Sequence, residues 1–166
     1  SGSGKMWVNY DTNDLQYSLD TSLGTVNSPA SFMGVWSQGG SLIQARSTYG
    51  GGAGKQNSAL TYGGISPGGA VTCTEEYDGS NWSAGGAMIA GRRTTGAGIQ
   101  DAAIAVGGAT PSRTNASEEY NGSAWASGGT TINTLTDRNV AGFQNSTVAV
   151  GGIGNSPYPI VAKTEQ

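Results

Sequence analysis

Histidine is absent from this sequence of 166 residues, cysteine occurs once, and charged residues make up only 11% of the chain. Without histidine there is no Ser-His-Asp triad, no Cys-His pair and no imidazole to serve as a general base or a metal ligand. The single thiol, Cys73, has no intrachain disulfide partner and no second thiol to complete a zinc site. The sequence therefore predicts neither a metal site nor a cofactor.

Long apolar runs and concentrations of one charge are missing as well. No stretch approaches the roughly 20 apolar residues of a membrane-spanning helix. The first five residues, Ser-Gly-Ser-Gly-Lys, show no apolar core of a signal peptide. The formal net charge is −3, without a basic patch or an acidic tail. We expect no membrane insertion and no nucleic-acid partner.

Glycine, in contrast, is abundant, with 29 residues, and Ser, Thr, Ala and Asn make up much of the remainder. Such a composition can indicate low complexity, but four tryptophans and seven tyrosines give this chain side chains to bury. No stretch shows the 3.6-residue apolar period of a helix. The composition predicts an ordered all-β fold.

The sequence repeats itself about every 44 residues. Each copy contains Ala-Gly-x-Gln, in which the glutamines are Gln56, Gln100 and Gln144. A short apolar stretch follows and ends in a glycine pair, namely Gly63-Gly64, Gly107-Gly108 and Gly151-Gly152. Two copies continue with Glu-Glu-Tyr-x-Gly-x-x-Trp, in which the aromatic residues are Tyr77 with Trp82 and Tyr120 with Trp125. Trp36 aligns with these tryptophans, and an arginine follows each one, at Arg46, Arg92 or Arg93, and Arg138.

One copy of the repeat reads as four short antiparallel strands. In the second copy we expect strands at 96–100, 102–106 and 118–120, and a fourth that starts at Trp125. The glycine pair suits a positive φ and close approach of neighbouring backbone. Asn121-Gly122, like Asp78-Gly79 before it, is a strong signal for a two-residue hairpin turn.

The order Arg, Gly-Gly and Glu-x-Tyr-x-Gly-x-x-Trp resembles the kelch repeat over residues 34–166. The forms Glu-Glu-Tyr-Asn-Gly-Ser-Ala-Trp, Ala-Gly-Ile-Gln and Ala-Val-Gly-Gly are similar to kelch-like repeats in tail-fibre and other appendage proteins of bacteriophages. The stretch that begins Lys5-Met6-Trp7-Val8-Asn9 resembles the β-hairpin that often precedes such repeats. The resemblance implies a β-propeller with blades of four antiparallel strands. Its units lie at 36–81, 82–124 and 125–166, after an N-terminal hairpin with closing strands at 1–33.

Three copies fall short of the about four to eight blades of a closed propeller. Residues 5–35 offer extra strands at 6–10, 15–19 and 31–35, which provide one way to close the ring. A ring shared between chains, an open stack of sheets and a larger parent chain are the alternatives. The sequence does not choose among them.

Acidic and basic residues of the repeat suggest two possible enzyme active sites. The pairs Glu75/Glu76 and Glu118/Glu119 resemble the two carboxylates of a glycoside hydrolase. The arginines Arg46, Arg93 and Arg138 suggest a carboxylate-binding cluster of the kind found in sialidase propellers. Both sets recur at equivalent places, whereas an active site is a single constellation. We therefore expect the glutamates to accept hydrogen bonds from neighbouring turns or an arginine, and we predict no enzyme activity.

The other repeated residues are also expected to serve the fold. Tryptophans can stack on sugars, but packing between blades is the favoured role of Trp36, Trp82 and Trp125. The glutamine series is expected to satisfy buried backbone groups near a turn.

Variation between copies concentrates after the glycine pairs, in loops suited to recognition. The candidate recognition residues there are Ser66, Pro67, Pro111, Arg113, Asn155 and Tyr158. We predict a structural or binding component of a phage virion appendage, located on the virion or otherwise outside the cell. Its expected partners are further copies of the chain, other virion proteins or a host-surface glycan. The alternative is a soluble, lectin-like propeller that binds sugars.

Overall fold

The computed structural model describes residues 5–9, 14–18, 36–154 and 160–166, and divides the chain into two units, Ser1–Gln38 and Gly39–Gln166. In the first unit, strands β1 (Lys5–Asn9) and β2 (Asp14–Ser18) form an antiparallel hairpin. They begin and end one residue before the strands expected at 6–10 and 15–19. The strand expected at 31–35 lies outside the described residues.

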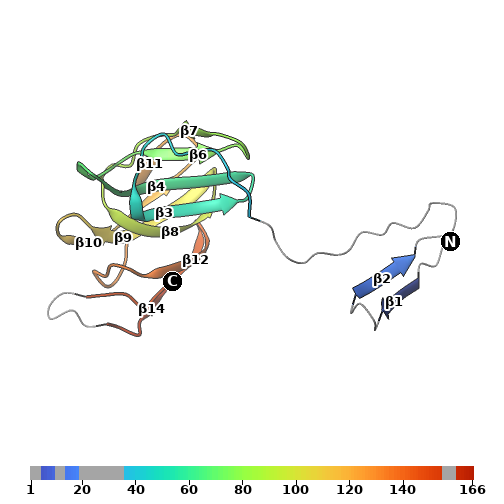
Figure 1. Ribbon diagram of the computed structural model, residues 1–166. Helices are drawn as coiled ribbons and strands as arrows, with labels where there is room; N and C mark the ends of the chain where they lie inside the picture. Colours follow the sequence, from blue (N-terminus) through green and yellow to red (C-terminus); the bar gives the residue numbers. More distant parts are fainter. Residues whose placement is uncertain (1–4, 10–13, 19–35, 155–159) are drawn as a thin grey trace. The chain divides into compact units, whose positions relative to one another are not determined.

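The second unit contains three antiparallel sheets that follow one another along the chain (Figure 1). The first sheet has the strands β3 (Ser47–Lys55), β4 (Ser58–Ser66), β6 (Thr74–Tyr77) and β7 (Trp82–Ala84), with the short β5 (Gly69–Ala70) beside β4. The second has β8 (Arg93–Ile99), β9 (Ala102–Ala109), β10 (Arg113–Tyr120) and β11 (Trp125–Thr130). The third has β12 (Asn139–Phe143), β13 (Ser146–Val150) and β14 (Thr164–Glu165). Apart from β5, which pairs only with β4, strands that follow one another in sequence are neighbours in each sheet.

The all-β prediction is confirmed, since the described residues form strands and turns but no helix. None of them therefore belongs to a helix that could cross a membrane. The strands expected in the second copy are also present, although β9 and β10 extend further than the sequence indicated. The described sheets do not join into a closed ring.

The first strand of each sheet lies beside the first strand of the next. Strand β3 contacts β8, and β8 contacts β12. A small residue is needed where these strands approach the neighbouring sheet. A Cβ added to Gly96 would lie 2.0 Å from the carbonyl oxygen of Ile104 and 2.0 Å from the hydroxyl of Tyr62, which belongs to the first sheet. Gly96 thus permits close packing of the first two sheets.

The expected hairpin turns connect the third and fourth strands. Gly79 and Gly122 have φ values of 97° and 89°, which glycine adopts without strain. The side-chain oxygen of Asp78 accepts hydrogen bonds from the backbone N–H groups of Ser80 (2.8 Å) and Asn81 (2.7 Å). These bonds hold the pKa of Asp78 below its usual value. Asn121 makes the equivalent two bonds in the second sheet.

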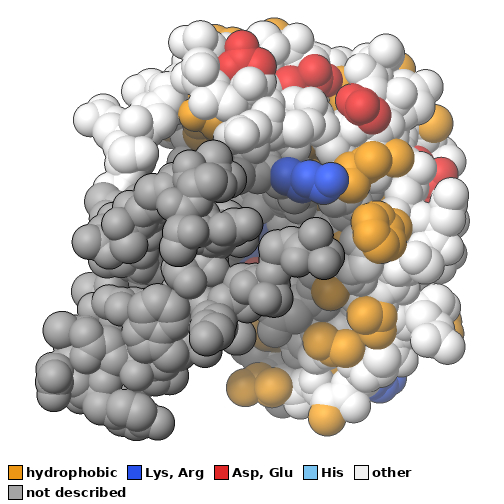
Figure 2. All heavy atoms as spheres, turned by 90° about the vertical axis from the view of Figure 1, so that its right-hand side faces the viewer, with side chains coloured by type: hydrophobic (Ala, Val, Ile, Leu, Met, Phe, Trp, Pro, Cys, Tyr) orange, Lys and Arg blue, Asp and Glu red, His pale blue; other side chains and the backbone are white. Residues whose placement is uncertain are grey.

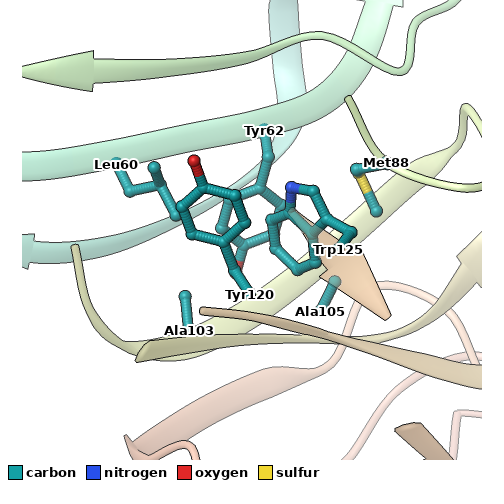
Figure 3. Close-up of a cluster of buried hydrophobic side chains, with 7 residues drawn as sticks. All are labelled: Leu60, Tyr62, Met88, Ala103, Ala105, Tyr120 and Trp125. Carbon is teal, nitrogen blue, oxygen red and sulfur yellow. The ribbon is translucent and has the colours of Figure 1, made fainter. Parts of the chain in front are cut away.

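A cluster of buried side chains joins the first sheet to the second (Figure 3). We call it the aromatic junction, and it comprises Leu60, Tyr62, Met88, Ala103, Ala105, Tyr120 and Trp125. The rings of Tyr62 and Trp125 lie 4.6 Å apart at 60°, an edge-to-face arrangement. The indole N–H of Trp125 donates to the hydroxyl of Thr74 (2.8 Å), and the Tyr120 hydroxyl donates to Glu76 (2.5 Å). Burial, together with the hydrogen bond to Glu76, raises the pKa of Tyr120 to about 12.

Candidate functional site

A buried ion pair links the segment that enters each sheet to the third strand of that sheet. In the second sheet Arg92 pairs with Glu118, and both side chains are buried. The Glu118 carboxylate also accepts hydrogen bonds from the backbone N–H groups of Ile89 (2.7 Å) and Ala90 (3.3 Å). Arg92 Nε donates to the carbonyl oxygen of Gly107 (2.9 Å). We call this arrangement an ion-pair cluster.

The first and third sheets contain the same cluster. In the first sheet Arg46 pairs with Glu75, whose carboxylate accepts from the backbone N–H groups of Ile43 and Gln44. In the third sheet, Arg138 lies 3.3 Å from Glu165, and Ile132 and Asn133 supply the backbone N–H groups. Because each carboxylate is fully engaged, the predicted structural role of these glutamates is confirmed.

The third cluster also shows how its charges are balanced. Burial alone would raise the pKa of the Glu165 carboxyl, but the hydrogen bonds from Asn133 and Arg138 outweigh it and lower the pKa. Arg138 additionally donates to the carbonyl oxygen of Ala149 (3.3 Å). The ionised form of Glu165 is therefore the stable one in this cluster.

These clusters correct the assignment of the repeated arginine. Arg92, and not Arg93, is the counterpart of Arg46 and Arg138, because it makes the same ion pair. Since Arg46 and Arg138 each bind the glutamate of their own sheet, they do not converge on one carboxylate-binding site. Arg93 begins β8 and lines a cavity that Arg138 also lines, described below.

The side chains of adjacent glutamates point to opposite faces of the sheet, as neighbouring residues of a strand do. Glu75 and Glu118 lie in ion-pair clusters. Glu76 accepts a hydrogen bond from the hydroxyl of Tyr120, and Glu119 lines a cavity between the second and third sheets. The two carboxylates of each pair thus face different surroundings, which does not match the shared substrate of a glycoside hydrolase.

Two of the three repeated glutamines connect neighbouring sheets. Gln100 Nε2 in the second sheet donates to the carbonyl oxygens of Ala59 (3.1 Å) and Tyr77 (2.9 Å) in the first. Gln144 Nε2 makes the equivalent bonds to Ala103 (3.0 Å) and Tyr120 (2.9 Å) in the second. Their expected role is confirmed. Gln56, in the first sheet, is exposed.

The tryptophans differ in their surroundings. Trp125 is buried in the aromatic junction, as expected. Trp82 is half-buried, and its ring lies 4.9 Å from that of Tyr77. Trp36 belongs to the first unit, whereas Trp82 and Trp125 begin strands of the second. Its packing between blades stays a prediction.

The glycine pairs have the backbone conformation that the sequence indicated. All six residues of the pairs have positive φ, between 55° at Gly107 and 118° at Gly108. A Cβ at Gly63 would lie 2.7 Å from the carbonyl oxygen of Arg92, and one at Gly107 would lie 3.1 Å from that of Leu135. The glycine pairs therefore let the segment that enters the next sheet lie close to the second strand of the preceding sheet.

The candidate recognition loops follow the glycine pairs, and the first two lie at the ends of β4 and β9. Ser66 and Pro67 lie at the turn between β4 and β5. The Ser66 hydroxyl donates a hydrogen bond to the carbonyl oxygen of Gly69 and accepts one from the backbone N–H of Gly68. Pro111 lies in the exposed turn between β9 and β10. Arg113 begins β10 and donates to the hydroxyl of Thr136 (3.4 Å). Asn155 and Tyr158 lie outside the described residues.

A cavity of about 240 Å³, which we call the loop cavity, is lined by Thr136, the hydrogen-bond partner of Arg113. The cavity therefore lies close to the loop between β9 and β10. It is lined by residues of the first two sheets and of the segment that enters the third, which include Gly50, Arg93, Thr94, Thr136, Asp137 and Arg138. Asp137 has a φ of 54°, in the left-handed region that aspartate tolerates better than most residues. The buried Nε of Arg138 has no hydrogen-bond partner within the described structure. The cavity thus combines cationic, anionic and hydroxyl groups.

Sequence reasoning singled out two residues of the loop cavity, Arg93 and Arg138, as part of a suggested carboxylate-binding cluster, but it missed the other residues of the cavity. A further sequence signal is Asp137, which directly precedes the repeated arginine where the other copies have Ala45 and Gly91. The face shown in Figure 2 carries scattered acidic and few basic side chains over its described part. Within the described residues, no three His, Cys, Asp or Glu side chains are grouped to hold a metal ion. Cys73 is a free, half-buried thiol.

Comparison with known proteins gives no relative to guide the assignment. No protein-family model matches the sequence, and no curated protein matches it significantly. The functional argument therefore depends on the internal repeat and on the geometry of the described residues.

Proposed function

We propose that the chain is a non-enzymatic binding protein, a bacteriophage virion appendage component that presents loops on a kelch-like propeller scaffold to a host surface. One observation carries this proposal. Of the residues that suggested catalysis, Arg46, Arg138, Glu75 and Glu118 are held in equivalent buried clusters, while the sequence varies at the loops that follow the glycine pairs.

The scaffold part of the proposal is supported by the arrangement of the sheets. Each sheet connects its strands in sequence order, and the first strands β3, β8 and β12 lie side by side. In a propeller the first strands of successive blades line the centre in this way. The glutamine bonds between sheets repeat from one pair of sheets to the next, as expected for successive blades.

The loop cavity is the place where we expect a ligand. Arg93 and Arg138 supply cationic groups, Asp137 an acceptor, and Thr136 a hydroxyl. Such a mixture of donors and acceptors suits a ligand rich in hydroxyl groups, and an acidic sugar adds a carboxylate for the arginines. A host-surface glycan is therefore the proposed ligand class. The same cavity supports the second candidate, a soluble sugar-binding protein, which differs in location and not in chemistry.

Glycan-array binding of the full chain tests the proposal, with Asp137→Asn as the site variant. Asparagine keeps the left-handed backbone and removes the charge, so we expect binding to fall by about tenfold, as for loss of a charged hydrogen bond. The matched control is Asp101→Asn, at the exposed turn between β8 and β9. The proposal fails if no glycan binds, if both variants bind like the parent chain, or if the bound glycans are cleaved. Labelling of phage particles with an antibody to the chain separates the two candidates.

A further inference from the structure

A further cavity, of about 280 Å³, is lined by the second sheet and the segment that enters it. We call it the hydroxyl pocket, because its wall includes the hydroxyl-bearing side chains of Thr110, Ser112, Thr114, Ser117 and Ser127. Arg92 and Glu118 of the ion-pair cluster also line it, together with Ile89, Ala90 and Ala116. None of these residues lines the loop cavity, so the two sites are separate.

Comparison of the three copies shows that the hydroxyl of Thr114 does not serve the fold. Arginine and glutamate of the ion-pair cluster recur in every copy. Thr114 lies four residues before its cluster glutamate, and the equivalent residues of the other two copies are Val71 and Val161. The backbone N–H of each valine donates to the second residue of its glycine pair, with which Thr114 is also paired in the second sheet. Two sheets therefore fold with valine at the place of this threonine.

Two more hydroxyl groups of the pocket are absent from the first copy. Ser127, two residues after Trp125, corresponds to Ala84. Ser112, six residues before the cluster glutamate, corresponds to Gly69. Since the first sheet forms without these hydroxyl groups, they are available for another purpose in the second.

Strand β10 is irregular where it borders the pocket. Its pairing with β9 shifts in register between Thr114 and Ser117, and its pairing with β11 shifts between Ala116 and Glu118. Such bulges turn side chains in a new direction and are frequent next to functional sites. In the first sheet, the four residues of β6 pair with β4 in regular register. The irregularity is thus a second feature that distinguishes this side of the second sheet.

The charges of the pocket balance. Among the described residues that line it, only Arg92 and Glu118 are charged, and they form a buried ion pair. A charged ligand would therefore meet no free counter-charge there. The buried Nη2 of Arg92 has no hydrogen-bond partner within the described residues, which favours a ligand oxygen at this end of the pocket. Ile89, 62% exposed, adds an apolar surface.

We propose that the hydroxyl pocket binds one uncharged sugar ring. Hydroxyl groups of the ring exchange hydrogen bonds with Thr114 and Ser127, since hydroxyls both donate and accept, and its C–H face lies against Ile89. The volume of about 280 Å³ is just below the roughly 300–1,000 Å³ of pockets for drug-sized ligands, so it suits a single ring. The bonds of Ile89 and Ala90 to Glu118 hold this wall in place, which reduces the entropic cost of binding. The site does not depend on the proposed glycan binding at the loop cavity.

Titration of the isotope-labelled full chain with methyl glycosides of glucose, galactose and mannose, followed by two-dimensional NMR, tests the proposal. With at least one of them we expect saturable shifts of the amide signals of residues 110–116. The expected dissociation constant is on the order of 1–10 mM, as for a small ligand held by a few hydrogen bonds. Absence of saturable shifts at these residues with all three glycosides, at concentrations well above this range, would overturn the proposal.

A double variant with residues of the first copy locates the contacts. Thr114→Val combined with Ser127→Ala removes two hydroxyl groups and introduces side chains that the fold already accepts at these positions. We expect the dissociation constant to rise by at least about tenfold, since loss of one neutral hydrogen bond weakens binding about fivefold. The matched control is Thr72→Val combined with Ser80→Ala, at exposed positions outside the pocket. Equal binding by the two double variants would contradict the assigned contacts.

Two further titrations separate this site from the loop cavity. Asp137→Asn is expected to leave the shifts at residues 110–116 unchanged, because Asp137 does not line the hydroxyl pocket. Loss of these shifts in that variant would overturn the separate site. The methyl glycoside of glucuronic acid is expected to bind the hydroxyl pocket more weakly than the glucoside, because its carboxylate meets no free counter-charge. Tighter binding of the charged glycoside at residues 110–116 would contradict the proposed ligand class.

Discussion

At the scale of single residues, the ion-pair clusters show how the interior of each sheet accommodates charged side chains. Each buried glutamate is neutralised by one arginine and receives two backbone N–H groups from the segment that enters its sheet. A buried carboxylate without such partners is strongly disfavoured. The cluster therefore fixes the entering segment to the third strand of its sheet. Glutamate and arginine recur in the sequence because each of the three sheets contains one such cluster.

Removal of one charge from a cluster tests this account. Glu118→Gln leaves the buried Arg92 without its counter-ion, and we expect the free energy of unfolding to fall by roughly 3–5 kcal/mol. Urea denaturation monitored by circular dichroism measures the change. Glu119→Gln, at the next residue of the same strand but on the opposite face, is expected to change stability by less than about 0.5 kcal/mol. Similar losses for both variants would show that the ion pair has no special role.

At the scale of strands and turns, much of the fold could be predicted because the signals are local. Asn121-Gly122 and Asp78-Gly79 turn the chain through their positive-φ glycines and side-chain hydrogen bonds. The glycine pairs likewise adopt the predicted conformation. The choice between Arg92 and Arg93 could not be made from sequence, because it depends on which side chain reaches Glu118 across the sheet.

Packing between strands of different sheets gives a prediction at this scale. Gly96→Ala places a methyl group 2.0 Å from the Tyr62 hydroxyl of the first sheet and 2.0 Å from the Ile104 carbonyl oxygen of its own sheet, so both the contact between the sheets and the pairing of β8 with β9 must shift. We expect a loss of stability of about 1–3 kcal/mol, typical of overpacking, and a lower midpoint of thermal unfolding. The control is Gly129→Ala, because a Cβ there meets nothing within 4 Å. The close approach of the sheets would be contradicted if Gly96→Ala were as stable as the control.

At the scale of the whole molecule, the sequence indicated three repeats but not what surrounds them. Trp36 matches the repeat in sequence, but it belongs to the first unit, whereas Trp82 and Trp125 begin strands of the second. The sequence singled out Arg93 and Arg138 of the loop cavity but not the cavity itself, since its walls come from segments that are far apart in the chain.

The central claim is that the sheets pack as successive, equivalent blades, and the three glutamines test it most directly. Gln100 and Gln144 each bond two carbonyl oxygens of the preceding sheet, whereas Gln56 belongs to the first described sheet and is exposed.

The measurement is the free energy of unfolding of Gln100→Ala, Gln144→Ala and Gln56→Ala by urea denaturation. We predict losses of about 1–3 kcal/mol for the first two variants, because each leaves two backbone acceptors without a partner. Gln56→Ala is predicted to match the parent chain. Equal stability of all three variants, or a loss confined to Gln56→Ala, would contradict the packing of the sheets as successive blades.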